Sequence, residues 1–257
     1  MFRFDADLEL EPAGDHRWQT RVSSSWDIGT NPNGGYVQAL CLQAIGRELP
    51  HPHPLTATSH FLRPLASGEP ADIVVETIRR GTSVSTGAAS IVQDGRERVR
   101  TVATFTDLGA QQGRTLQRAY PPTWPGPDEC LKREEGVTPP FRFFEQFDVR
   151  IVPELAHTSA TEIGGWIRFA DGRNPDLLSM PLFADGFPPT VMSLNVLGWV
   201  PTIELTVHFR SIPAPGWLQA RFETEVVRDG LFEEDGTIWD AEGLVVAKSR
   251  QMAKILD

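Results

Sequence analysis

The sequence predicts an α+β fold in which two antiparallel sheets each wrap around a central buried helix. Three observations support this prediction. One stretch, residues 35–45, is apolar on almost every side; strand-like runs separated by tight turns follow it; and the same order of elements occurs a second time. With 257 residues, 40% of them hydrophobic, the chain is long enough for two such units with a substantial core.

The central helix of the first half is predicted over residues 35–49. It follows the turn Asn31-Pro32-Asn33-Gly34-Gly35, and up to Ile45 only Gln38 and Gln43 interrupt its apolar surface. A helix that is apolar nearly all round is buried rather than half-exposed. It is too short to span a bilayer, and Pro50, Pro52 and Pro54 end it.

The strands of the first half surround this helix in the chain. One strand is expected before it, over 17–23, and four after it, over 55–62, 71–78, 84–93 and 99–106. Asp94-Gly95 between two strand-like runs is a hairpin signal. Consecutive strands joined by tight turns form an antiparallel sheet.

Residues 109–140 change in character, because proline, glycine and charged residues replace the alternating pattern. An irregular segment of this length is uncommon inside one compact domain. We therefore predict an N-terminal unit over 1–108, a linker over 109–140 and a C-terminal unit over 141–257.

The C-terminal unit repeats the order of the first. Strands are predicted over 141–152 and 164–170, then a turn at Asp185 followed by an apolar helical run to residue 197, then strands over 202–211, 218–227, 237–241 and 244–255. Four positions of the two halves match in register: His60 with His208, Gly81 with Gly230, Gly95 with Gly243, and Ala103 with Gln251. This series indicates an internal duplication.

Composition excludes several classes of protein. The net charge of −10 argues against nucleic acid and anionic membranes as partners. The chain lacks a signal-peptide pattern and an apolar run of membrane-spanning length, so we expect a cytoplasmic protein. Cys41 and Cys130 do not form a zinc-binding pattern with histidines, and we expect neither a metal nor a cofactor.

An apolar helix wrapped by a meander, present twice in one chain, resembles the double hotdog of the acyl-CoA thioesterase II family. Three segments carry the resemblance: Asn33-Gly34-Gly35-Tyr36-Val37 before the first helix, 56–64 with its His-Phe-Leu-Arg-Pro, and the ending 243–251. The resemblance implies hydrolysis of an acyl-CoA to a free acid and CoA, with a carboxylate activating the water.

The same resemblance implies the site residues. The family's Asp at the start of the second helix falls on Asp185, its Thr on Thr202 and its Gln on Gln251. A carboxylate can take a proton from water, and Thr and Gln can hold that water by hydrogen bonds. Amides of the turn at Asn33, Gly34 and Gly35 are expected to meet the substrate carbonyl, and Arg80 the CoA phosphates.

Two other functions stay open at this point. A hydratase or dehydratase of acyl thioesters would need a histidine beside Asp185, and a non-catalytic acyl-CoA-binding protein would lack the polar trio. The chain has no Gly-x-Ser-x-Gly elbow, which argues against an α/β-hydrolase. An open sheet edge favours association into a homo-oligomer.

Overall fold

The computed structural model describes residues 1–132, 142–156, 161–196 and 199–256. The first half begins with short elements and then enters helix α2. Its elements are α1 (Arg3–Asp7), β1 (Glu11–Pro12), β2 (Arg17–Arg21), η1 (Ser24–Trp26), β3 (Asp27–Ile28), β4 (Asn31–Pro32), α2 (Gly34–Glu48), β5 (His53–Phe61), β6 (Pro70–Arg80), β7 (Val84–Gln93) and β8 (Arg96–Thr106).

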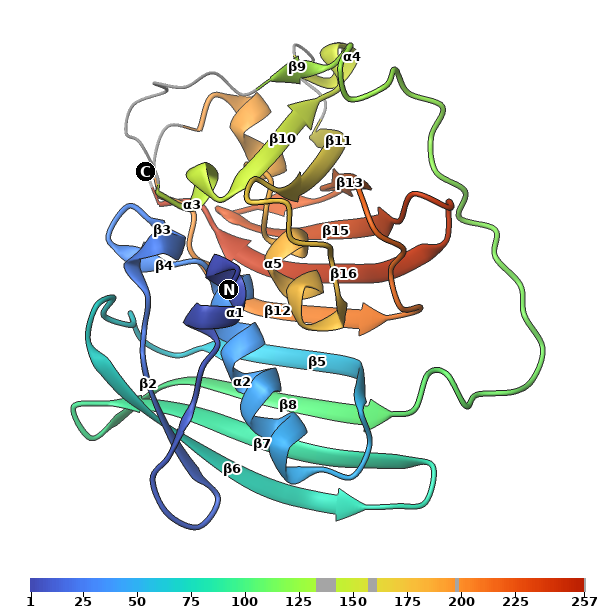
Figure 1. The fold of residues 1–257 in the computed structure, drawn as a ribbon. Helices are drawn as coiled ribbons and strands as arrows, with labels where there is room; N and C mark the ends of the chain where they lie inside the picture. Colours follow the sequence, from blue (N-terminus) through green and yellow to red (C-terminus); the bar gives the residue numbers. More distant parts are fainter. Residues whose placement is uncertain (133–141, 157–160, 197–198, 257) are drawn as a thin grey trace.

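Helix α2 is the buried helix that the sequence predicts. Asn33 is its N-cap, and its Oδ1 accepts from the backbone N–H of Tyr36 at 2.9 Å, which satisfies one of the free amides of the first turn. Its apolar side chains are buried almost all round. Figure 1 shows α2 lying in the hollow of the curved sheet formed by β5 to β8.

The predicted meander of the first half is also confirmed, with β5, β6, β7 and β8 within a few residues of the expected strands. The β7–β8 hairpin turns at Asp94 and Gly95, whose φ angles of 52° and 68° are both positive. Two positive φ angles define the type I′ turn that the Asp-Gly pair favours.

The second half has the same strand order around a much shorter helix. Its elements are β9 (Leu131–Lys132), α3 (Arg142–Glu145), β10 (Phe147–Ile151), α4 (Pro153–Ala156), β11 (Glu162–Phe169), η2 (Leu177–Ser179), α5 (Met180–Ala184), η3 (Thr190–Leu194), β12 (Thr202–Phe209), β13 (Leu218–Glu223), β14 (Val227–Arg228), β15 (Leu231–Trp239) and β16 (Val245–Lys254).

The helix predicted after Asp185 is wrong in position. The central helix of the second half is α5, which ends at Ala184, and Asp185 is its C-cap. Pro188 and Pro189 interrupt the chain beyond it, so that only a 3₁₀ turn, η3, forms there; residue 197 of the predicted run lies outside the described residues.

Three predicted strands also need correction. The strand expected over 218–227 ends at Glu223 as β13, and Val227 belongs to the short strand β14. The strand expected over 141–152 begins only at Phe147, because Arg142–Glu145 form a helical turn, and residue 141 lies outside the described residues. The strand expected over 237–241 is longer, since β15 already begins at Leu231. The latter difference matters for function, as it places Glu234 inside the sheet.

The two predicted sheets join into one. In the described residues the strands form a 14-stranded antiparallel sheet, and β5 pairs with β12 at its centre (Figure 1). Thr58 and Thr206 lie opposite each other there, with their hydroxyl oxygens 2.8 Å apart.

The register of the strands supports the internal duplication. Ala57 pairs with Ala103 in the first half, and Leu205 pairs with Gln251 in the second, so each residue lies 148 positions from its counterpart. The centre of the β5–β12 pairing obeys the same offset, because Thr58 and Thr206 are themselves 148 positions apart. The two halves are therefore related by a pseudo-two-fold axis that passes between these threonines.

The segment between β8 and β9 is irregular but held against the second half. Residues 107–130, all of them described, contain no helix or strand. The indole N–H of Trp239 donates to the Ala119 carbonyl at 2.8 Å, and that of Trp166 to the Pro125 carbonyl at 2.9 Å. Residues 133–140 of the predicted linker lie outside the described residues.

In the part of the chain that the structure describes, no helix combines the length and the apolar character needed to cross a bilayer.

Candidate active site

Asp185 lies where the two halves meet. It follows α5 in the chain and faces the beginning of α2, since its Oδ2 accepts from Asn33 Nδ2 at 2.7 Å and from the Gly35 N–H at 3.1 Å. Asn33 Nδ2 also donates to the Asp185 carbonyl at 2.9 Å. The first half thus positions a carboxylate that belongs to the second.

This placement corrects the expected environment of Asp185. The carboxylate stands at the positive end of a helix, but that helix is α2 of the other half rather than one that Asp185 begins. A helix N-terminus stabilises a nearby negative charge through its free amides and its dipole. Asp185 was expected at the start of the second helix, and the structure places it after α5 and against the start of α2.

The electrostatics of Asp185 favour acid–base chemistry near neutral pH. Burial, with a smaller contribution from the negative charge of Glu234, raises the pKa of the Asp185 carboxyl to about 7, against the opposing effect of the hydrogen bonds from Gly35 and Asn33. The residue as a whole is only half-buried. A carboxyl that titrates near neutrality and keeps some exposed surface is suited to take a proton from water.

Thr202 and Gln251 lie together, from neighbouring strands β12 and β16. The Thr202 hydroxyl donates to Gln251 Oε1 at 2.9 Å. The other end of the amide donates from Gln251 Nε2 to Glu234 Oε1 at 2.7 Å. Gln251 is only 7% exposed, so its orientation is fixed by these two bonds.

Glu234 is bonded to this pair and was not expected from the sequence. It lies on β15, is only 5% exposed, and accepts from the Thr190 N–H at 2.8 Å through Oε2. Burial raises the pKa of the Glu234 carboxyl. Its charge raises the pKa of Asp185, whereas the hydrogen bonds of Asp185 among the described residues go to Asn33 and Gly35. We call Asp185 together with the bonded trio of Glu234, Gln251 and Thr202 the polar cluster.

A signal for Glu234 was present in the strand pattern. Phe232, Glu234, Gly236 and Ile238 are alternate residues of one strand, and the structure buries all of them. Because alternate residues share a face, the apolar Phe232 and Ile238 already predict that Glu234 points inward. Three consecutive acidic residues, 233–235, are typical of an exposed segment, and this made the inward position of Glu234 hard to recognise from the sequence.

The predicted substrate-binding residues fall in two places. Asn33, Gly34 and Gly35 lie at the site, but the Gly35 amide meets the Asp185 carboxylate instead of an open space. Arg80 lies at the other end of α2, where its Nη2 donates to the Glu48 carbonyl at 3.1 Å. That end is roughly 20 Å from Gly35, at a rise of 1.5 Å per residue, so Arg80 is not part of the cluster.

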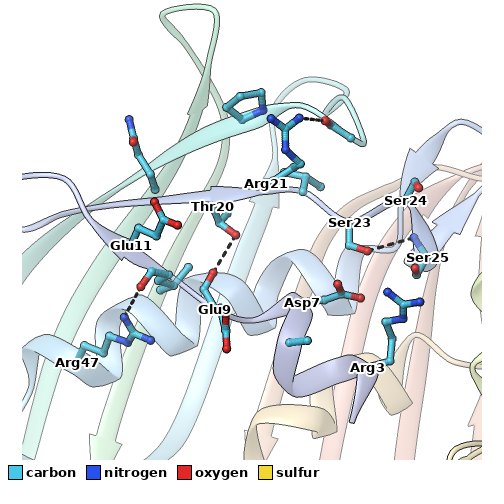
Figure 2. A pocket seen from close by; sticks show the side chains of 16 residues that line it. Arg3, Asp7, Glu9, Glu11, Thr20, Arg21, Ser23, Ser24, Ser25 and Arg47 are labelled. Carbon is cyan, nitrogen blue, oxygen red and sulfur yellow. Dashed lines mark hydrogen bonds between the residues drawn. The ribbon is translucent and has the colours of Figure 1, made fainter. Parts of the chain in front are cut away.

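A separate hollow of about 870 Å³ lies beside α1 and β2 and does not include the cluster (Figure 2). Its charged lining is mixed, with Arg3, Arg21, Arg47, Asp7, Glu9 and Glu11. Two of these arginines bond to backbone carbonyls, Arg21 to Gly68 and Arg47 to Leu10. This balance of charge does not select for an anion or a cation.

The fold and the junction site define a double-hotdog protein. The sequence matches the acyl-CoA thioesterase N-terminal domain over residues 22–106 and the acyl-CoA thioesterase C-terminal domain over residues 121–255. The chain therefore belongs to the acyl-CoA thioesterase family.

Individual relatives agree with this assignment. A crystal structure described as a thioesterase II from Thermobifida fusca is 32% identical, covers 100% of this chain and 98% of its own, and superposes with a TM-score of 0.91. An acyl-CoA thioesterase II from Mycobacterium marinum shares the fold, with 23% identity, 98% of each chain covered and a TM-score of 0.81. An uncharacterised protein of Mycobacterium tuberculosis is 27% identical over 93% of this chain and 90% of its own.

Proposed function

We propose that this protein hydrolyses the thioester of an acyl-CoA, with Asp185 as the general base. The observation that carries the proposal is the polar cluster at the junction of the two halves. There a buried carboxylate with a pKa of about 7 stands beside the bonded trio of Glu234, Gln251 and Thr202. Family membership supports the reaction class.

In the proposed reaction, water is held near Thr202 and Gln251 and loses a proton to Asp185. The hydroxide equivalent forms a bond to the thioester carbon, and the carbonyl becomes an oxyanion. The tetrahedral intermediate then breaks its C–S bond. CoA leaves as a thiolate that takes the proton back from Asp185, and the products are a carboxylic acid and free CoA.

The beginning of α2 has a role in each of these states. Before attack, the amides near Gly35 stabilise the charge on Asp185. As the proton moves to Asp185, the negative charge passes to the nearby carbonyl oxygen, and the same positive helix end stabilises it there. In this proposal Asn33, Gly34 and Gly35 contact the substrate carbonyl only when Asp185 becomes neutral.

Glycine at position 34 lets Phe61 and Asp185 lie close to the start of α2. A Cβ there would lie 2.9 Å from Phe61 Cζ and 3.2 Å from Asp185 Oδ2. A side chain at this position would therefore displace the Phe61 ring and crowd the carboxylate. Four features remain predictions from the sequence: contact of Arg80 with CoA phosphates, the boundaries 1–108 and 141–257 of the two units, a cytoplasmic location and a homo-oligomer.

We expect the pH dependence to follow Asp185. The base acts in its ionised form, and burial raises its pKa to about 7. Activity is therefore present above this pH and lost as the pH falls. We expect kcat/KM for an acyl-CoA to fall about tenfold per pH unit below about 7, because kcat/KM reports the ionisation of the free enzyme. Activity that stays level down to pH 5 would contradict this assignment.

The direct test is release of free thiol from a panel of acyl-CoAs of short to long chain length. We expect turnover on at least part of the panel, with one acid formed per thiol released. Binding of acyl-CoA without thiol release would favour the non-catalytic alternative. Change of an enoyl-CoA absorbance without thiol release would favour a hydratase, although none of the described histidines bonds to Asp185.

A further inference from the structure

Glu234 is a buried acid that the proposed reaction does not use as a base. Each of its carboxylate oxygens accepts from an N–H group: Oε1 from Gln251 Nε2 at 2.7 Å and Oε2 from the Thr190 backbone at 2.8 Å. Among the described residues it has no ion pair with a lysine, arginine or histidine. Burying a carboxylate without a cation costs free energy. We therefore expect Glu234 to have a role other than packing.

The hydrogen-bond chemistry supplies this reason. Both oxygens of Glu234 face N–H groups, which is the pattern of an ionised carboxylate, an acceptor only. In that state the Gln251 amide turns its NH₂ group toward Glu234 and its oxygen toward Thr202. The Thr202 hydroxyl then gives its hydrogen to Gln251. The lone pairs of Thr202 and the second N–H of Gln251 are left for water and substrate.

A glutamine at position 234 would not impose this order. The Thr190 N–H can only donate, so it holds the glutamine oxygen and leaves the glutamine NH₂ facing Gln251. The Gln251 amide must then present its Oε1 to residue 234, which turns it around. In that arrangement Thr202 accepts from Gln251 and points its own hydrogen at the substrate. The donors and acceptors offered to the water are then reversed.

The two halves of the chain provide an internal comparison. Glu234 pairs with Gln251 on β15 and β16, and the equivalent pair on β7 and β8 is Gly87 with Ala103. A Cβ on Gly87 would lie 3.0 Å from Ile45 Cγ2 of α2, so the long helix fills the space that Glu234 occupies in the second half. The acid and the amide therefore occur together in one half and are absent together from the other.

We propose that Glu234 is a positioning residue of the site, which fixes the orientation of the Gln251 amide so that its carbonyl oxygen faces Thr202. This inference rests on the proposed hydrolysis for its catalytic consequence. Glu234 has a second effect through its charge, which adds to burial in raising the pKa of Asp185.

Among the described residues, Glu234 is the one side chain whose charge shifts the pKa of Asp185. Helix α5 carries no charged side chain, and the charged residues of α2 lie at its far end, at Arg47 and Glu48. The remaining charged side chains of β12, β15 and β16 alternate with the inward residues and lie on the outer face of the sheet: Glu204, His208, Glu233, Asp235, Lys248, Arg250 and Lys254.

The test compares Glu234→Gln with Glu234→Asp and with the matched control Glu233→Gln. Glu233 is the adjacent residue of the same strand, on the outer face, and its carboxylate accepts from the Val226 N–H at 3.0 Å. A melting curve of each variant verifies that it folds. The readouts are kcat, KM, the pH dependence of kcat/KM, and the NMR signals of the Gln251 side-chain amide.

We expect Glu234→Gln to lower kcat by about 10- to 100-fold, as for the loss of one oriented group, with KM changed less than about threefold. The pH below which kcat/KM falls, which we call the acid limb, should decrease by about one unit in this variant, because a negative charge that raises the pKa of Asp185 is removed. Glu234→Asp should keep the acid limb of the wild type, since the charge remains. Glu233→Gln should match the wild type in every readout.

The NMR signals test the orientation without turnover. In the wild type and in Glu233→Gln we expect one Gln251 amide proton to be shifted downfield by the carboxylate, and in Glu234→Gln this shift should be lost. An unchanged Gln251 amide, or a kcat and acid limb equal to those of Glu233→Gln, would overturn the proposal. If the wild type hydrolyses no acyl-CoA while the amide signals change as expected, the proposed hydrolysis fails and the structural assignment of Glu234 stands.

Discussion

Asp185→Asn is expected to lower kcat/KM for acyl-CoA hydrolysis by about 10²- to 10⁴-fold, the contribution of a positioned general base. In free energy of activation this is about 3–5 kcal/mol. A carboxamide cannot take a proton from water. The measurement is thiol release at about pH 8.5, where Asp185 of the wild type is ionised.

The substitution should leave the fold in place. Both hydrogen bonds to the carboxylate go to the single oxygen Oδ2, from Asn33 and Gly35, and the oxygen of an asparagine can accept both. The carboxyl of Asp185 has a raised pKa in the folded protein. Its contribution to stability is therefore complete below its unfolded pKa of about 4 and lost as the pH rises through about 7. Asparagine does not ionise, so its contribution to stability does not decrease as the pH rises. The variant should therefore have a Tm at pH 8 no lower than that of the wild type.

Asp171→Asn is the matched control. Asp171 is an exposed residue of the same half, and its carboxylate accepts from the backbone N–H groups of Arg3 and Arg173. We expect this variant to keep the wild-type kcat/KM within about twofold, since it lies outside the cluster. A normal rate in Asp185→Asn would remove Asp185 as the base and leave Glu234 as the remaining buried carboxylate of the site.

The first half of the fold was predictable because its signals are local. The Asn33 cap, the apolar run after it and the prolines at its end define α2 within a few residues. Asp94-Gly95 fixes the β7–β8 hairpin through two positive φ angles. Each of these features depends on neighbours in the sequence, so the chain itself determines them.

The second half was harder because its helix is short. Helix α5 spans only Met180–Ala184, with Pro181 in its first turn, and five residues give no helical periodicity to detect. The apolar run after Asp185 was more prominent in the sequence, but Pro188 and Pro189 keep it from forming a regular helix. Packing against α2, rather than local propensity, places α5.

The site was predictable only as separate residues. The resemblance named Asp185, Thr202 and Gln251, and the structure brings Thr202 and Gln251 into direct contact. Asp185 is coupled to this pair through the charge of Glu234, and its hydrogen-bond partner is the N-terminus of α2, roughly 150 positions away in the sequence. Such contacts follow from the pairing of β5 with β12, which no local pattern specifies.

Gly35→Ala is the second substitution with a large expected effect, this time on stability. A Cβ at position 35 would lie 2.1 Å from the carbonyl oxygen of Pro181 and 2.7 Å from Leu182 Cα. These are backbone atoms of the segment that crosses α2, and they cannot turn away as a side chain can. Replacement of a helical glycine by alanine normally stabilises a helix by about 0.5–1 kcal/mol, so here the sign of the effect is reversed.

We expect Gly35→Ala to lower the free energy of unfolding by about 3 kcal/mol, at the upper end of overpacking effects. In a chain of this length that corresponds to a decrease in Tm of roughly 6–12 °C. Any folded fraction should also lose activity, because the Gly35 N–H that positions Asp185 has to move with α5. Thermal melting and thiol release on the same preparation measure both effects.

Gly46→Ala is the control on the same helix. A Cβ there would meet only the ring of Phe105, at 3.3 Å, and a ring edge can shift by a few tenths of an ångström. The gain in helix propensity and this small contact should nearly cancel, leaving the stability within about 1 kcal/mol of the wild type. If Gly35→Ala behaves like Gly46→Ala, the close crossing of α2 and α5 is wrong. The position of Asp185 at the start of α2 would then be wrong as well, because the same crossing sets both.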